Sequence, residues 1–241
     1  MERMFLHGVI LFFITTNVAQ AFRVSPMLVE FEPKGTKATQ TLFVENNRDK
    51  KIAVQVEAFH RLQDNKGKET RTPTDEFTIY PTQFILEAKE KRNIRVTWTG
   101  EPAPKAELPY RIVVGELPVE FKDQEEKKAS AGSLKFLLEY VTSAYVKPLL
   151  AKAAVEATVS NLLNGKIELQ LKNTGSAHQL LRAIKIKFVQ EKDNTAWLPT
   201  VAELKQFEAE NILPGHSRFF SFENVRNLSL PLKVEIKFEP L

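Results

Sequence analysis

The chain has 241 residues, of which 43% are hydrophobic and 27% charged, and it contains no cysteine. This composition excludes a disordered chain, which lacks such apolar content, and it excludes disulfide-framed scaffolds and cysteine-based metal sites. The 34 basic and 30 acidic residues leave a formal charge of only +4. Such a small excess, spread along the chain, gives no indication of nucleic-acid binding.

The first 21 residues have the pattern of a secretory signal peptide. Arg3 precedes a short apolar run over 4–14, and polar residues then lead to an Ala-Gln-Ala ending at Ala21. This run is shorter than the roughly 20 apolar residues that a transmembrane helix requires, and no other segment of the sequence is long enough. We therefore predict cleavage after Ala21, export from the cytosol and no membrane insertion.

Alternation of apolar and polar residues with a period of two dominates the mature chain. In the segment 39–46, for example, Leu42 and Val44 share one face, while Thr41 and Phe43 share the other. Many short segments of this kind, separated by polar turns, predict an all-β sandwich or barrel. The segment 202–209 is compatible with a helical turn or a loop. The other alternating segments lie at 52–58, 94–98, 157–159, 167–171, 184–188, 219–222 and 232–238.

A division near Pro148 separates two regions of strand-like sequence. The long alternating stretch 133–147 ends there, and proline cannot donate a hydrogen bond to a central ladder. About 125 mature residues precede the division and about 90 follow it, each close to the size of an immunoglobulin-like sandwich. We predict two tandem sandwich domains over 22–147 and 148–241.

Catalytic and metal-binding motifs are missing from the sequence. Its four histidines, His7, His60, His178 and His216, stand apart from one another, without an H-x-H or H-E-x-x-H spacing. There is no G-x-S-x-G elbow and no glycine-rich phosphate loop. We therefore predict no catalytic residue, no metal, no cofactor and no enzymatic activity. A site assembled between the domains from distant residues is the alternative.

The stretch 133–145 is unusual because apolar residues occur on both of its faces. One face carries Leu134, Phe136, Leu138 and Tyr140, and the other is mixed. An antiparallel sandwich strand normally has one polar face. Two interpretations remain open: a strand buried on both sides, or an edge strand that presents apolar residues to an extended partner, which most proteins avoid.

Seven segments occur in an order and spacing that are unlikely to coincide by chance. They are SPMLVEFEP at 25–33, FVEN at 43–46, PTQFIL at 81–86, KRNIRV at 91–96, PYRIVVGELP at 109–118, YVKP at 145–148 and LKNTGSAH at 171–178. With them the chain resembles the periplasmic chaperones of chaperone–usher pilus (fimbria) assembly, and most closely their archaic, or non-classical, branch. The resemblance covers essentially the whole mature chain.

The resemblance implies two immunoglobulin-like domains set at an angle, and a protein of the periplasm without metal or cofactor. Its partners would be pilus subunits that lack their last strand, which it completes with a donated strand, and an outer-membrane usher that receives them. The donor residues would be Leu134, Phe136, Leu138 and Tyr140. The alternative is a secreted structural or adhesive protein of two sandwiches.

The resemblance also implies a basic anchor for the C-terminal carboxylate of the subunit. Classical members of the family use an Arg on the first strand and a Lys late in the donor strand, where this chain has Leu28 or Val29 and Ser143. The archaic branch has an Arg after the Tyr of the preceding strand. Arg111 matches it, and Arg95 is a second candidate.

Glu116 and Lys147 match positions that help to fix the angle between the domains in this family. In a regular strand Arg111 and Glu116 point to opposite faces, because they are five residues apart. They would therefore have different tasks. An ordinary structural or surface ion pair is the alternative for Arg111, Glu116 and Lys147.

Overall fold

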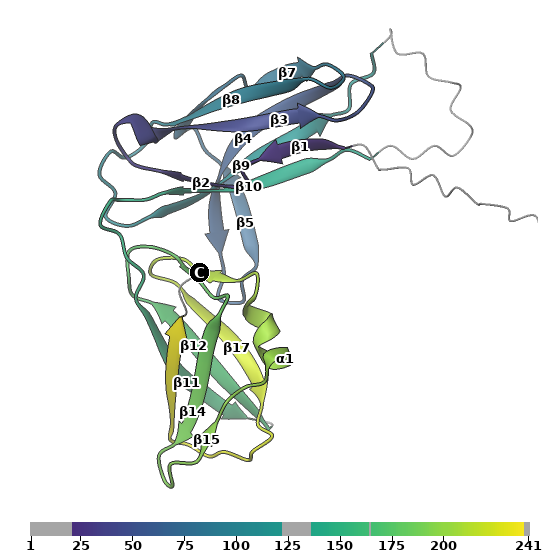
Figure 1. The fold of residues 1–241 in the computed structure, drawn as a ribbon. Helices are drawn as coiled ribbons and strands as arrows, with labels where there is room; N and C mark the ends of the chain where they lie inside the picture. Colours follow the sequence, from purple (N-terminus) through teal and green to yellow (C-terminus); the bar gives the residue numbers. More distant parts are fainter. Residues whose placement is uncertain (1–20, 122–135, 164, 239–241) are drawn as a thin grey trace, which may run out of the picture.

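The computed structural model describes residues 21–121, 136–163 and 165–238, which form two β-rich domains (Figure 1). Most strands of the first domain run across the view, whereas its β5 and the strands of the second domain run down it, so the two domains lie at an angle. The prediction of an all-β chain with two sandwich domains is confirmed. Residues 1–20 of the predicted signal peptide lie outside the described part.

The first domain is built from two sheets and one short 3-10 turn, Thr36–Ala38. One sheet has the order β1-β3-β8-β6, and the other has the order β2-β10-β9-β4-β5, with β7 also paired to β4. The strands are β1 (Phe22–Ser25), β2 (Leu28–Phe31), β3 (Thr39–Asn46), β4 (Ile52–Gln63), β5 (Glu69–Pro73), β6 (Phe77–Tyr80), β7 (Gln83–Leu86), β8 (Lys91–Trp98), β9 (Leu108–Leu117) and β10 (Glu139–Val146).

The alternating pattern places the apolar face of each strand in a core between these two sheets. Leu42 and Val44 of β3 are fully buried, whereas Phe43 between them is exposed. Ile94 of β8 and Ile112 of β9 belong to the same core. Each such side chain contributes roughly 1.5–3 kcal/mol through its burial.

The second domain has a separate core between smaller sheets of the orders β11-β12-β17 and β15-β14-β18, with the pair β13-β16 beside them. Leu169, Phe188 and Phe222 are buried there. The strands are β11 (Val155–Leu163), β12 (Lys166–Asn173), β13 (Gln179–Leu180), β14 (Ile184–Gln190), β15 (Ala196–Trp197), β16 (Asn211–Ile212), β17 (Ser217–Glu223) and β18 (Leu232–Phe238).

The segment that the sequence left undecided forms helix α1 (Val201–Leu204), which continues as the 3-10 turn Lys205–Phe207. Thr200 and Glu203 form a capping box: the Thr200 hydroxyl accepts from the Glu203 amide, and the Glu203 carboxylate accepts from the Thr200 amide at 2.7 Å. These bonds satisfy amides that a helix start leaves free. Phe207 then inserts into the core of the second domain.

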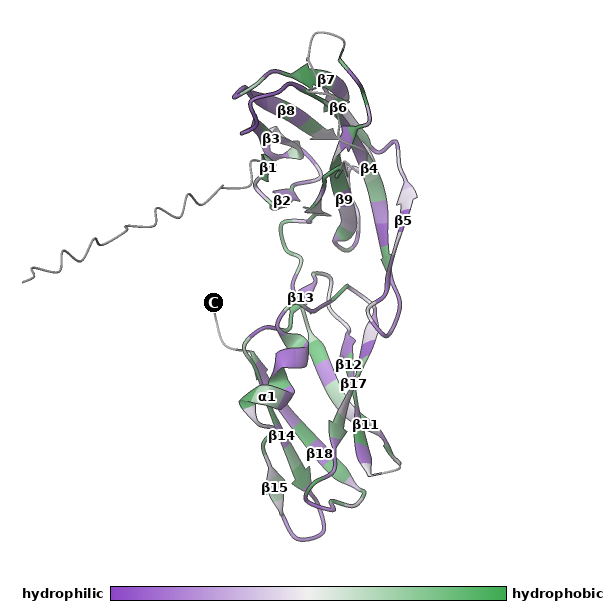
Figure 2. Cartoon of the chain, turned by 90° about the vertical axis from the view of Figure 1, so that its right-hand side faces the viewer, coloured by the Kyte–Doolittle hydropathy of each residue, from purple (hydrophilic) through white to green (hydrophobic). Residues whose placement is uncertain are grey.

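The β4–β5 hairpin connects the two domains (Figure 2). At its tip, the Asn65 carbonyl accepts a hydrogen bond from the Phe219 amide of β17 at 3.1 Å. The guanidinium of Arg218 packs on Gly67, in the space that a Cβ would occupy, and Gly67 has a φ of +90°. A side chain at position 67 would therefore strain the backbone and displace the Arg218 guanidinium.

Strand β10 begins later than the stretch predicted from 133 to 147. Leu138 still accepts a hydrogen bond from the Glu116 amide at 3.0 Å, but it precedes the strand. The next bond of this ladder would need an amide hydrogen at position 118, and Pro118 has none. Phe136 consequently lies outside the strand, and residues 133–135 lie outside the described part.

Candidate functional site

Strand β10 is covered by a neighbour along only half of its outer edge. On its inner side it pairs with β9 along its whole length, from Glu139 to Val146. On its outer side, β2 pairs in parallel with Ser143–Val146 alone. Among the described residues, no strand covers the outer edge of Glu139–Thr142. This part of the chain therefore offers backbone hydrogen-bonding groups to an added strand.

The even-numbered side chains of β10 lie on one face of the strand. Followed from the covered half through the open half and on to Phe136, just before the strand, they change from buried to exposed. Ala144 is fully buried. Tyr140 is half-buried, with its ring edge-on to Phe22 at 4.8 Å and its hydroxyl donating to the Phe22 carbonyl at 2.5 Å. Leu138 packs against the same core, whereas Phe136 is 73% exposed. The row thus changes from core to surface within one segment.

These positions bear on the two interpretations of the stretch. In the described part, β10 has β2 beside it along Ser143–Val146, and no strand lies beside the outer edge of Glu139–Thr142. Of the four predicted donor residues, Leu138 and Tyr140 already pack against the core of their own domain, whereas Phe136 is largely exposed. Leu134, the fourth, lies outside the described residues.

Arg111 lies at the point where the covered half of β10 begins. It is opposite Ser143 across β9 and β10, and Ser143 is in turn opposite Leu28 across β10 and β2. The Arg111 Nη1 group contacts the Ser143 hydroxyl, and its Nε and Nη2 groups donate to both oxygens of Glu69, with Nη2 to Oε2 at 2.5 Å. Arg111, Ser143 and Leu28, the positions compared for the carboxylate anchor, are therefore neighbours across β9, β10 and β2.

Arg61 is a second basic residue of this cluster, and the sequence did not reveal it. Its side chain is 7% exposed, and each of its nitrogens has a partner. Nε donates to Glu69 at 2.8 Å, Nη1 to the Tyr145 hydroxyl at 2.9 Å, and Nη2 to Asn211 of the second domain at 3.0 Å. Nothing in the local pattern of β4 distinguishes Arg61, because its partners come from distant segments.

The charges of this cluster control the ionisation of Glu69. Burial acts to raise its pKa, but the hydrogen bonds and charges of Arg111 and Arg61 outweigh burial and hold the pKa below its ordinary value. Burial also raises the pKa of Tyr145, so this hydroxyl remains a neutral donor and acceptor. The cluster therefore contains two guanidinium groups and one carboxylate.

His178 is part of the contact between the domains. Its Nδ1 lies 2.6 Å from Oε1 of Glu107, and its ring stacks on Tyr145 with centroids 4.1 Å apart. Glu107 is fully buried, and its amide donates to the Ser176 carbonyl of the second domain at 2.8 Å. The described residues include no group of three or more His, Asp or Glu side chains that could hold a metal ion.

The remaining predicted residues lie away from the arginine cluster. Arg95 is exposed on β8, in the other sheet, so the structure does not bring it to Arg111. Glu116 lies at the opposite end of β9 from Leu108, which begins this strand near the second domain, and it pairs with Arg48 at 2.7 Å within the first domain.

Lys147 lies directly at the start of the link between the domains. Its amide donates to the Phe31 carbonyl at 2.8 Å, and its Nζ is 3.8 Å from Glu30 of β2. The contacts that cross between the domains instead involve Arg61, Glu107 and the β4–β5 hairpin. The geometry therefore gives no support to an interdomain role for the Glu116 side chain, whose partner lies in its own domain.

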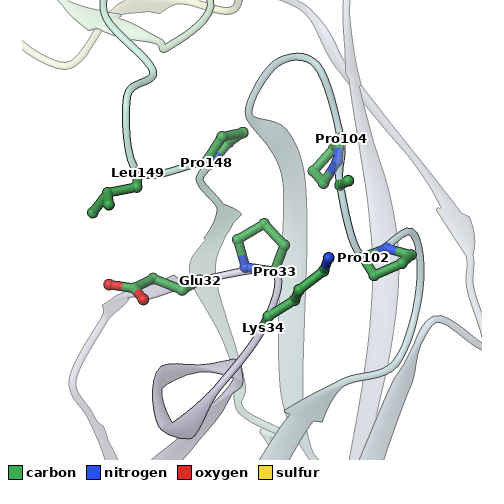
Figure 3. Close-up of a pocket in the computed structure, with 8 residues that line it drawn as sticks. Glu32, Pro33, Lys34, Pro102, Pro104, Pro148 and Leu149 are labelled. Carbon is green, nitrogen blue, oxygen red and sulfur yellow. The ribbon is translucent and has the colours of Figure 1, made fainter.

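The described part of the first domain includes a smaller and a larger hollow. The smaller, of about 360 Å³, lies beside the link to the second domain, and Figure 3 shows Pro33, Pro102, Pro104 and Pro148 around it. The larger, of about 700 Å³, lies at the start of the open edge and is lined in part by Phe136. Ionisable side chains also line them, among them Glu32 and Lys34 in the smaller hollow and Arg48 and Glu116 in the larger. In the described part of the chain, no helix combines the length and apolar character of a membrane span.

The fold is shared with solved fimbrial chaperones. The chain matches the class 5 fimbriae chaperone CfaA with a TM-score of 0.61 and 15% identity, over 92% of this chain and 94% of that one. It matches a chain of the CsuC–CsuE chaperone–tip adhesion subunit complex from the archaic Csu pili of Acinetobacter baumannii with a TM-score of 0.55 and 16% identity, over 83% and 89%. It also matches a chain of the Salmonella enterica SafA pilin–SafB chaperone complex, with a TM-score of 0.53 and 15% identity over 85% of each chain.

The sequence itself identifies the family. No curated protein sequence matches the chain significantly. The model of the family "Pili and flagellar-assembly chaperone, PapD N-terminal domain" matches residues 21–148, which is more than half of the chain. This family consists of assembly chaperones and not of enzymes. The chain therefore belongs to the PapD family of pili and flagellar-assembly chaperones.

Proposed function

We propose that this protein captures pilus subunits in the periplasm by adding its β10 edge to their incomplete sandwich, and that it then delivers them to an outer-membrane usher. The observation that carries the proposal is the open outer edge of Glu139–Thr142, next to an apolar row that leaves the core of the domain. The predicted signal peptide over 1–21 supports export to that compartment. Solved relatives in complex with a pilin or a tip subunit agree with such a partner.

Strand addition explains why both the backbone and the side chains of this edge matter. The main chain of an added strand supplies hydrogen bonds, and every second side chain enters a pocket of the partner and sets the register. Chaperone–pilin complexes are an established example of this recognition mode. In this chain the side chains offered would be those of Leu134, Phe136, Leu138 and Tyr140.

These four residues are not equivalent donors. Phe136 is 73% exposed in the free protein, so its burial by a subunit would contribute roughly 1.5–3 kcal/mol. Tyr140 already packs on Phe22, and a subunit would gain less from covering it. We therefore assign the main apolar contribution among the described donors to Phe136.

Arg111 is suited to receive the end of the partner strand. A strand lying along the open edge of β10 cannot continue past Ser143, because Met27 and β2 occupy the edge from there on. The partner chain would therefore end beside Arg111, whose planar guanidinium is suited to a carboxylate. This argument supports Arg111 as the anchor, and it does not extend to Arg95 on the other sheet.

The test is co-expression in the periplasm with a candidate pilus subunit that is unstable alone. We expect wild-type chaperone to co-purify with the subunit in equal amounts and Phe136→Glu to lose at least nine-tenths of it while remaining folded, because a charge replaces the exposed apolar donor. The matched control is Leu149→Glu, which introduces the same charge at a side chain that is 84% exposed on the link between the domains.

Two outcomes would contradict the proposal. One is normal accumulation of the subunit in cells that lack the chaperone, which would favour a structural or adhesive protein. The other is equal capture by wild type and Phe136→Glu, which would remove the β10 edge from the interface.

A further inference from the structure

The carboxylate position beside Arg111 is filled in the free protein by one of its own side chains. Glu69, the first residue of β5, accepts from Arg111 Nε at 3.0 Å through Oε1 and from Nη2 at 2.5 Å through Oε2. Oε2 also accepts from Arg61 Nε at 2.8 Å. Glu69 thus occupies the side of the Arg111 guanidinium that would bind an incoming carboxylate with two parallel hydrogen bonds.

We propose that Glu69 is an internal competitor: it occupies Arg111 in the free chaperone, and the C-terminal carboxylate of a captured subunit displaces it. This inference rests on the function proposed above and adds the regulation of its anchor site. The exchange replaces one carboxylate by another, so no proton or other group is transferred.

The free protein needs such an internal partner. The side chains of Arg61 and Arg111 are only 7% and 15% exposed, and both contact the same carboxylate. Without an anion between them, two cations largely removed from water would repel each other. While no subunit is bound, the negative charge of Glu69 offsets the repulsion between these two guanidinium groups.

Displacement is favoured over sharing by the position of Glu69. Its side chain is 24% exposed, more than the side chains of Arg61 and Arg111, so it can move into solvent more readily than either arginine. Its strand, β5, is an edge strand that pairs with β4 on one side only. A second carboxylate placed beside Glu69 would meet like charge and find the same nitrogens already engaged.

Arg61 keeps the site intact during the exchange. Its other two nitrogens donate to Tyr145 and to Asn211 of the second domain, so it remains oriented when Glu69 leaves. The ionisable groups nearby include Glu107 and His178, which pair with each other. They also include Arg71, which lies opposite Arg61 across β4 and β5 and pairs with Glu139 of β10. A partner that ends in an amide, or whose carboxylate is out of register, would leave Glu69 in place on Arg111, so the exchange selects for a correctly placed chain end.

The test measures how fast purified chaperone–subunit complexes exchange into an excess of labelled chaperone. The subunit is used in its native form and with two glycines added to its C-terminus, which moves the carboxylate out of register. We expect Glu69→Gln to slow release of the native subunit about tenfold, because the competing carboxylate is gone. It should leave release of the extended subunit unchanged. Glu57→Gln, the same charge change at an exposed residue on the strand that carries Arg61, is the matched control and should change neither.

Further arms separate failure of the inference from failure of the proposed function. Unchanged or faster release by Glu69→Gln, together with loss of capture by Arg111→Ala, would overturn the displacement and retain the anchor. Undiminished capture by Arg111→Ala would overturn both. Absence of any complex with wild type would overturn the chaperone function itself.

A second measurement avoids the variant altogether, should Glu69→Gln fail to fold. Carboxyl ¹³C signals of Glu69 can be titrated with acid in free and in subunit-bound wild-type chaperone. We expect the pKa of Glu69, which the two arginines hold low in the free protein, to return toward its ordinary value in the complex. A pKa that stays low in the complex would overturn the displacement.

Discussion

The two halves of β10 differ in what covers them, although they carry the same alternation of side chains. In the half that β2 covers, Ala144 and Val146 are fully buried. In the other half, Tyr140 is half-buried, and Phe136, just before the strand, is largely exposed. One row of side chains therefore serves both as core and as surface.

This difference shows how an edge strand is kept open without destabilising the fold. The covered half contributes burial and ladder bonds on both sides, and these hold the strand in register. The open half keeps its inner ladder to β9, so its conformation is already set before a partner arrives. Preorganisation of this kind lowers the entropy that binding must overcome.

The sharpest test of the comparison places the same charge in the covered half and just before the open half. Ala144→Glu buries a carboxylate in the core, and we expect it to lower the free energy of unfolding by at least about 4 kcal/mol or to prevent folding. Phe136→Glu should change it by no more than about 0.5 kcal/mol, because that side chain is exposed. Urea unfolding followed by circular dichroism measures both. Equal effects would show that the two halves do not differ in this way.

The pH dependence of stability tests the boundary between the halves, where Glu69 holds Arg111. The folded state lowers the pKa of Glu69, so its contribution is complete above the ordinary glutamate pKa of about 4.3 and is lost as the pH falls through the folded value. We expect wild type to exceed Glu69→Gln in stability by about 1–2 kcal/mol at neutral pH, allowing for solvent screening.

This difference should shrink toward zero in acid, which denaturation at a series of pH values would show. A constant difference from neutral to strongly acidic pH would mean that the Glu69 charge contributes nothing. The matched variant Glu57→Gln should follow the wild-type curve throughout, because Glu57 is exposed.

The smallest effect concerns the transition between the halves. Tyr140→Phe removes the hydrogen bond to the Phe22 carbonyl and keeps the ring contact, so we expect a loss of about 0.5–1.5 kcal/mol in unfolding free energy. Subunit capture should remain within twofold of wild type. A large loss of capture with unchanged stability would instead place the Tyr140 hydroxyl in the interface.

Much of the fold followed from local patterns. Alternation at Leu42 and Val44 predicted which side of β3 is buried, and the unusual apolar stretch before Pro148 drew attention to β10. The start of that strand was predicted too early. It depends on whether position 118 of the neighbouring strand has an amide hydrogen, and strand periodicity does not take a proline on a neighbour into account.

The candidate site was predictable only in part. Arg111 was found through its motif after a tyrosine, whereas its carboxylate partner Glu69 was not. Glu69 and Arg61 come from the β4–β5 hairpin, and Asn211 lies 150 residues beyond Arg61 in the sequence. Arg95 has a similar local setting on an alternating strand, yet it lies on the other sheet.

The sequence by itself determined the all-β class, the two domains and the apolar row, because side-chain alternation and proline act over a few neighbouring residues. The tertiary structure alone decided which half of β10 stays open and which carboxylate occupies Arg111. Both depend on contacts between strands and side chains that are far apart in the sequence. Local sequence patterns do not predict such contacts.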